Sequence, residues 1–98
     1  MAEFITRVEL HDATEPDYEL LHSEMAKKGF SRTIVDQVGA THQLPTAEYY
    51  ISGELSVILV HQRAKQAADA TGKGSWILVS QIVSARFDLP VVRTLLRR

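Results

Sequence analysis

Hydrophobic and polar residues alternate along the first ten positions of the chain. Over Glu3–Leu10, one side of an extended backbone is mostly apolar and the other is mixed. A period of two is typical of a strand that buries one face. The sequence therefore predicts a first strand whose inward residues are Phe4, Thr6, Val8 and Leu10, and whose outward residues are Ile5, Arg7 and Glu9.

A helical period follows this strand. Thr14, with Asp17 three residues later, is a helix-start signal, because a cap residue and a nearby carboxylate satisfy free backbone amides. Gly29 supplies a stop. Between them, apolar side chains fall within one arc of a helical wheel, namely Tyr18, Leu21 and Met25. The pattern predicts a helix from about residue 15 to residue 28.

The rest of the chain continues the alternation of strands and helices. Phe30–Val35 predicts a second strand, and His42–Ile51 a third that tolerates Pro45 at an edge or bulge. Glu54 to about Thr71 predicts a second helix, whose small alanines favour a close approach to a sheet. Ser75–Phe87 is rich in isoleucine and valine and predicts the last strand. Val91 to Arg97 can form a short C-terminal helix.

The order β-α-β-β-α-β predicts the α+β class and a ferredoxin-like sandwich, with a four-stranded antiparallel sheet and two helices on one face. We expect a single domain over residues 1–98, with a core over about 3–88 and a basic C-terminal segment over 89–98. Both faces of the last strand are apolar, which is unusual for a half-exposed sheet. Either a homodimer packs sheet against sheet, or the C-terminal helix covers that face.

Composition excludes several classes of protein. A chain of 98 residues with 45% hydrophobic and 23% charged residues fits one globular domain. The absence of cysteine excludes disulfides, thiolate zinc sites and cysteine nucleophiles, and favours a cytoplasmic setting. The longest apolar run, Val57–Val60, is too short to span a bilayer, and the N-terminus has no signal pattern. We therefore expect no membrane association.

The net charge of −1 conceals an asymmetry between the two halves of the chain. Residues 1–49 carry four basic and nine acidic side chains, whereas residues 50–98 carry seven basic and three acidic ones. The basic surplus includes Arg93 and Arg97, which can contact RNA phosphates or can be a solvated tail. The overall balance lacks the high pI of a dedicated nucleic-acid binder, and no DNA partner is expected.

Local motifs for the common chemistries are missing. The sequence has no phosphate-binding loop, dinucleotide fingerprint, nucleophile turn or paired histidines at metal-ligand spacing. Glu9, His11 and Asp12 cluster where the first strand gives way to a loop, and such a cluster can transfer a proton. A divalent metal is compatible with them, although no motif indicates one, and solvated polar residues are the simpler interpretation. No cofactor is expected.

His22 is the second candidate for catalysis. On a helical wheel it falls inside the apolar arc of the first helix. It is therefore either a hydrogen-bonded core residue or, if accessible, a general acid or base or a phosphate ligand near neutral pH.

Candidate RNA-binding residues lie on the predicted strands. Arg32 and Tyr49, on adjacent strands, can bind phosphate and stack bases, as sheet-based RNA platforms do. Because Tyr49 and Tyr50 are consecutive, one ring must point into the core. Arg7, on the outward face of the first strand, is a further candidate for phosphate binding.

A strand–turn–strand pattern spans the middle of the chain: Met25-x-x-x-Gly29-Phe30-Ser31, then Ile34-Val35-x-x-x-Gly39-x-x-x-Gln43-Leu44, then Tyr50-Ile51. It resembles the antitoxin endoribonucleases of type V toxin–antitoxin systems, the GhoS family, over roughly residues 3 to 70. The resemblance implies a ferredoxin-like fold, similar to the small CRISPR adaptation nucleases, and cleavage of a toxin's messenger RNA. A family member has an acidic residue at the position of Glu9 and an arginine at that of His22.

Two functional hypotheses follow. The first is a GhoS-like RNA-binding protein and endoribonuclease, in which His22 or His11 deprotonates the ribose 2′-hydroxyl and Arg32 holds the phosphate. The alternative is a non-catalytic dimerisation or protein-interaction domain that uses the open sheet face.

Overall fold

β1 (Ala2–Leu10) is the central strand of a three-stranded antiparallel sheet in the computed structural model, which describes residues 1–92. β4 (Glu48–Gly53) pairs with one edge of β1, and β5 (Ser75–Gln81) pairs with the other. The predicted first strand is confirmed, and the side chains that alternate toward its apolar face are buried. A strand that is paired on both sides leaves few of its backbone groups unsatisfied, so β1 anchors the other elements.

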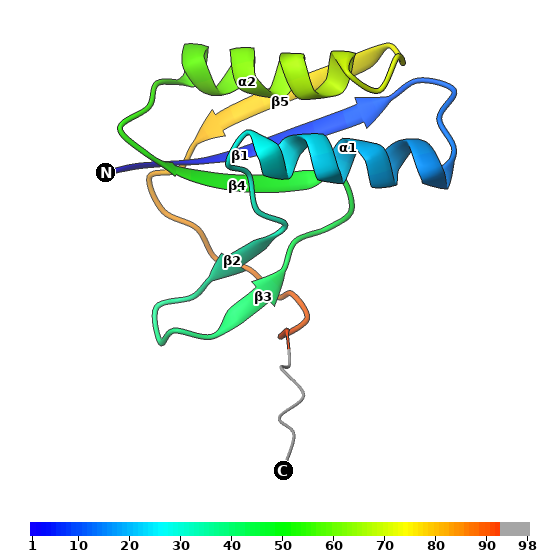
Figure 1. Ribbon diagram of the computed structural model, residues 1–98. Helices are drawn as coiled ribbons and strands as arrows, with labels where there is room; N and C mark the ends of the chain where they lie inside the picture. Colours follow the sequence, from blue (N-terminus) through cyan, green and yellow to red (C-terminus); the bar gives the residue numbers. More distant parts are fainter. Residues whose placement is uncertain (93–98) are drawn as a thin grey trace.

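Both helices lie on the same side of this sheet (Figure 1). α1 (Glu15–Lys27) begins where the sequence predicts: the Asp17 carboxylate accepts hydrogen bonds from the backbone N–H and the hydroxyl of Thr14, at 2.8 and 3.1 Å. α2 (Val57–Asp69) begins three residues later than predicted, because the Ser56 hydroxyl accepts from Leu59 N at 3.2 Å and caps the helix. Neither helix within residues 1–92 is long and apolar enough to cross a membrane.

The core fills the layer between the helices and the sheet. Each fully buried large apolar side chain in such a layer contributes about 1.5–3 kcal/mol to the free energy of unfolding. The alanines of α2 are fully buried, and this explains how the helix packs close to the strands. The core consists of Phe4, Val8, Leu10, Leu21, Met25, Phe30, Tyr49, Ile51, Val60, Ala64, Ala67 and Ala68.

The predicted four-stranded sheet is not what the structure shows. The predicted second strand pairs with β4 only through a bridge between Ser31 and Tyr50, and then forms a separate hairpin of β2 (Thr33–Val35) and β3 (Thr41–Gln43). The predicted third strand is divided in two. Its proline begins a turn in which Glu48 N donates to Pro45 O at 3.1 Å, so β3 and β4 are separate strands.

The predicted last strand is too long by six residues. β5 ends at Gln81, one residue before a final hydrogen bond from Ile82 N to Glu3 O at 2.8 Å. Because β1 begins at Ala2, the chain beyond Ile82 has no strand beside it to continue the ladder. Val83, predicted to be part of the strand, is 99% exposed.

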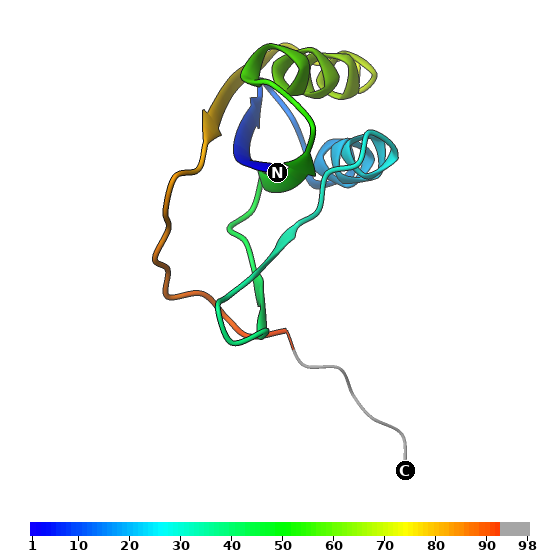
Figure 2. The ribbon, with the colours of Figure 1, turned by 90° about the vertical axis from the view of Figure 1, so that its left-hand side faces the viewer.

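After β5 the chain crosses to the hairpin, and both project away from the helices (Figure 2). Gln43 N donates to Pro90 O and Val92 N donates to Thr41 O, each at 2.8 Å. The predicted C-terminal helix is wrong at its first two positions, because Val91 forms a β-bridge with His42 and Val92 bonds to Thr41. Its remaining positions, 93–97, lie outside the described residues.

His42 fastens this crossing segment to the hairpin. Its Nδ1 lies 3.0 Å from the carbonyl oxygen of Leu89, and its Nε2 lies 2.8 Å from the carboxylate of Asp36. A carbonyl and a carboxylate can only accept, so both contacts are satisfied when the ring carries two protons. The Leu89 carbonyl and then the Asp36 carboxylate raise the pKa of His42, and the His42 contact lowers the pKa of Asp36.

We predict that this clamp is pH-dependent. Because the pKa of His42 is raised in the folded state, protonation of the ring stabilises the folded protein at pH values below 6.5, the ordinary pKa of histidine. This stabilisation is lost as the pH rises through the raised pKa of the folded state. The lowered pKa of Asp36 acts in the opposite sense, and stability is lost as the pH falls below 3.8. An NMR titration of the His42 ring should give a midpoint above 6.5, and Asp36→Asn should lower it. The amide signals of Gln43 and Val92 should follow the same curve; a midpoint below 6.5 would contradict the clamp.

Candidate functional site

His22 on α1 and Tyr49 on β4 are joined by a hydrogen bond of 2.6 Å between His22 Nδ1 and the tyrosine hydroxyl. Tyr49 lies on the inward face of β4, is fully buried and packs edge-on against Phe30. His22 lies beside the buried side chains of α1, as the helical wheel predicts, and is partly exposed. The pair therefore links α1 to the β4 side of the sheet.

Arg32 is brought to this pair by the turn that ends α1. Gly29, with a φ of +95°, turns the chain toward β4. Ser31 and Tyr50 then exchange two backbone hydrogen bonds, at 2.8 and 2.7 Å, which fix the position of the next residue. The Arg32 guanidinium is close enough to lower the pKa of both His22 and Tyr49, and its side chain is partly exposed.

The surroundings set the protonation of both partners. Burial is the main cause that lowers the pKa of His22 from its ordinary value of 6.5; the positive charge of Arg32 adds to it, and Glu19 opposes it. Burial also raises the pKa of Tyr49 far above neutral pH. At pH 7 His22 is thus a neutral imidazole, and Tyr49 keeps its hydroxyl proton.

The geometry also fixes which nitrogen of His22 carries the proton. The Tyr49 hydroxyl has one hydrogen-bond partner among the described residues, His22 Nδ1. Leaving a buried O–H unpaired costs about 1–3 kcal/mol, so the hydroxyl donates and Nδ1 accepts. The imidazole proton is therefore on Nε2. An N–H donor beside a guanidinium is suited to bind oxygens of a phosphate group.

The other three candidate catalytic residues lie elsewhere. Glu9 is exposed on the open face of the sheet, opposite Trp76 in the ladder, whereas His22 is on the helix side. The His11 ring packs edge-on against Trp76, with ring centroids 4.7 Å apart. The sheet thus separates Glu9 from His22. Within residues 1–92, no three histidine, aspartate or glutamate side chains are grouped so that they could hold a metal ion.

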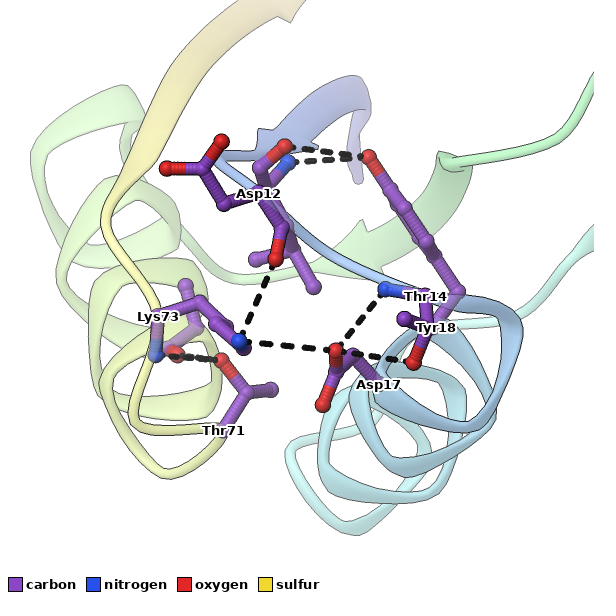
Figure 3. A network of polar contacts seen from close by, with 8 residues as sticks. Asp12, Thr14, Asp17, Tyr18, Thr71 and Lys73 are labelled. Carbon is purple, nitrogen blue, oxygen red and sulfur yellow. Dashed lines mark hydrogen bonds and ion pairs between the residues drawn. The ribbon is translucent and has the colours of Figure 1, made fainter.

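Asp12 belongs to a clamp between two loops (Figure 3). It has a φ of +51°, and its carbonyl oxygen accepts a hydrogen bond of 3.2 Å from Lys73 Nζ. The same ammonium lies 3.8 Å from the Asp17 carboxylate, and the Lys73 amide donates to the Thr71 hydroxyl at 3.2 Å. The Asp12 backbone therefore has a structural role in joining the start of α1 to the turn after α2.

The candidate RNA-binding residues are also dispersed. Arg7 is exposed on the open face of the sheet, between Glu48 and Leu78 in register. The ring of Tyr49 is fully buried and has no free face for a base, so direct stacking on RNA does not fit this structure. Of the two consecutive tyrosines, Tyr50 is on the open face. The candidates Arg93 and Arg97 lie outside the described residues.

The sequence did not identify Tyr49 as the partner of His22. A signal was available, because Tyr49 shares the inward face of its strand with Ile51, and a buried tyrosine hydroxyl needs a polar partner from the element that covers it. His22 on the inner arc of the first helix is such a partner. Which of the two possible tyrosines points inward depends on the register of β4, which the sequence pattern left open.

Together, the α+β fold and the hydrogen-bonded pair of His22 and Tyr49, with the Arg32 cation nearby, define a small domain with a polar site at the α1–β4 edge. Comparison with known protein families assigns this domain to a family. The family described as Endoribonuclease GhoS matches residues 1–81, so the chain belongs to the GhoS endoribonuclease family. The match extends beyond the expected 3–70 and includes β5. No curated protein matches the chain.

We predict that Tyr49→Phe unfolds more easily, by about 1 kcal/mol, because it loses the hydrogen bond to His22. It should also release His22 from a single tautomer, because Nδ1 loses the hydroxyl that holds it as an acceptor. Chemical denaturation and histidine ¹⁵N NMR measure these effects. Tyr50→Phe is the matched control, since its hydroxyl bonds Glu3 on the open face at 2.7 Å. Protonation of His22 on Nδ1 in the natural protein would contradict the assignment.

Proposed function

We propose that this protein is an endoribonuclease antitoxin that binds RNA at His22 and Arg32 and cleaves the messenger RNA of a toxin. Membership of the GhoS endoribonuclease family supports the reaction class. The observation that carries the site is the 2.6 Å bond that orients His22 beside the Arg32 cation. The substrate would place the protein in the cytoplasm.

The proposed cleavage uses the 2′-hydroxyl of the RNA as the nucleophile. The 2′-oxygen attacks phosphorus, the bond to the 5′-oxygen breaks, and a 2′,3′-cyclic phosphate forms. The 2′-hydroxyl proton passes to water, and the leaving 5′-oxygen takes the Nε2 proton of His22 in its imidazolium form, which leaves a neutral imidazole protonated on Nδ1. Arg32 stabilises the negative charge on the phosphate oxygens. His22 is thus proposed as the acid, in the imidazolium form that a bound phosphate favours, and not as the base that the sequence alone suggested.

Phosphate binding favours this role for His22. An anion beside the imidazole favours the imidazolium form, and pairing with Arg32 removes part of the repulsion that lowers the histidine's pKa. Once Nδ1 is also protonated, the Tyr49 hydroxyl can rotate and accept from it, so the same contact supports both protonation states. Tyr49 is a positioning residue in this scheme.

We also propose that the domain is ferredoxin-like. Its element order follows that arrangement if β3 and β4 are counted as one interrupted strand. The bridge between Ser31 and Tyr50 then marks where a complete second strand would pair with β4.

We expect His22→Ala to lower the rate of RNA cleavage by about 10²–10⁴-fold, the usual contribution of a general acid. His61→Ala is the matched control, because His61 is exposed on α2 and away from Tyr49. The assay is product formation from a mixed RNA pool by the folded variants, with and without magnesium. Equal cleavage by His22→Ala and the natural protein would remove His22 from the mechanism.

Salt-dependent binding locates the RNA surface. Arg32→Gln should weaken RNA binding and reduce the slope of log K against log salt by about 1, because one phosphate contact is lost. Arg7→Gln, on the opposite face of the sheet, should leave both unchanged if the site is at α1. The reverse result would place the RNA on the open sheet face.

The second candidate function is a non-catalytic interaction domain. It is favoured by one observation, the exposure of Trp76 (67%) and Leu78 (65%) on β5. Retained binding to a protein partner without any RNA cleavage would support this reading.

A further inference from the structure

β5 is an edge strand of the sheet. It pairs with β1 along one edge, and within residues 1–92 no strand pairs with its other edge (Figure 1). Residues 82–92 turn toward the hairpin and do not return to this edge. An unpaired strand edge has a row of free N–H and C=O groups that can template another strand.

The register shows which backbone groups are free. His11 N donates to Gly74 O, and Ile82 N donates to Glu3 O, at the two ends of an uninterrupted antiparallel ladder. In such a ladder, alternate residues bond to the neighbouring strand, so the even-numbered residues of β5 point their groups toward β1. The odd-numbered residues direct theirs to the free edge: Ser75, Ile77, Val79 and Gln81.

This edge lacks the features that usually prevent pairing. The sequence has no charged residue between Lys73 and Arg86, and no proline from Pro45 until Pro90. The ladder with β1 has no bulge over Ser75–Gln81. Natural edge strands are commonly protected by a lysine, a proline or a bulge, and none of these is present here.

Charge decides between a partner on the edge and one on the open face. On their open face, the three described strands of the sheet carry the carboxylates of Glu3, Glu9 and Glu48 and the cation of Arg7. Packing two copies face to face, as the sequence suggested, would bring these acidic groups together and desolvate them. Two uncharged β5 strands can meet edge to edge without that cost.

We propose that a second copy of this chain pairs with β5 antiparallel through its free edge and joins the two sheets into one of six strands. A two-fold axis at Leu78 pairs all four residues whose backbone groups face the free edge with their counterparts in the second copy. Ile77 then bonds with Val79 of the second copy, and Ser75 bonds with Gln81, giving about eight backbone hydrogen bonds. Leu78 lies opposite its own equivalent, with Trp76 diagonal to it.

The axis at Leu78 explains why both faces of β5 are apolar. On the helix side, the half-buried Ile77 and Val79 of the two copies become neighbours and extend the core across the axis. On the open side, Leu78 and Trp76, both about two-thirds exposed in one copy, cover each other. The dimer leaves the α1–β4 edge of each copy free, so this inference does not depend on the proposed cleavage.

The test is sedimentation equilibrium of the full chain from micromolar to millimolar concentration. The natural protein should have twice the monomer mass of 11.0 kDa at the higher concentrations. Leu78→Lys places two like charges opposite each other and should weaken dimerisation by about tenfold or more. Ile58→Lys is the matched control, because Ile58 is 69% exposed on α2, and it should dimerise normally. Circular dichroism confirms that both variants fold.

A cysteine crosslink tests the register. The chain has no cysteine, so Leu78→Cys introduces a single thiol that lies opposite its equivalent, at a distance that a disulfide can bridge. Mild oxidation should give a covalent dimer with Leu78→Cys and none with Ile58→Cys. A natural protein that stays monomeric up to millimolar concentration overturns the proposal. So does a dimer that is unaffected by Leu78→Lys and gives no Leu78→Cys crosslink.

Discussion

The pairing of β1 with a strand on each side is the constraint on which the rest of the structure depends. β1 supplies the central row of the core, and its ladders with β4 and β5 fix where the other two strands lie. Its first residue, Ala2, sets the end of β5, because a strand cannot extend its ladder past its neighbour. At its other end, Leu10 N donates to the Tyr18 hydroxyl at 3.0 Å, which ties α1 to the sheet.

The candidate site follows from the incomplete second strand. The chain meets β4 at Ser31 and then leaves it to form the hairpin, so within residues 1–92 no full strand covers this edge of β4. That departure leaves His22 and Arg32 partly exposed beside a buried tyrosine. A hydrogen bond to a buried, protonated phenol holds the imidazole in one orientation, which is what a group that must meet a phosphate oxygen needs.

The two edges of the sheet differ in chemistry. The α1–β4 edge is polar and carries a cation, whereas the β5 edge is uncharged and apolar on both faces. The first is suited to an anionic ligand, and the second to another strand. Because β1 lies between them, either surface can be occupied without blocking the other. The crossing segment, clamped at His42, is a third region that depends on neither.

The sequence by itself determined the periodic elements and their order. The alternation in β1, the cap and stop of α1, the alanine face of α2 and the two-faced β5 are all local patterns, and each is present in the structure. His22 on an inner arc and an inward tyrosine are local in the same sense. What the tertiary structure decided is non-local. The division of the predicted sheet, the end of β5 and the pairing of His22 with Tyr49 depend on which strands are neighbours. A periodic pattern indicates which side of a strand is buried. It contains no information on which strands are neighbours, because hydrogen bonding between strands depends on contacts between residues far apart in the sequence.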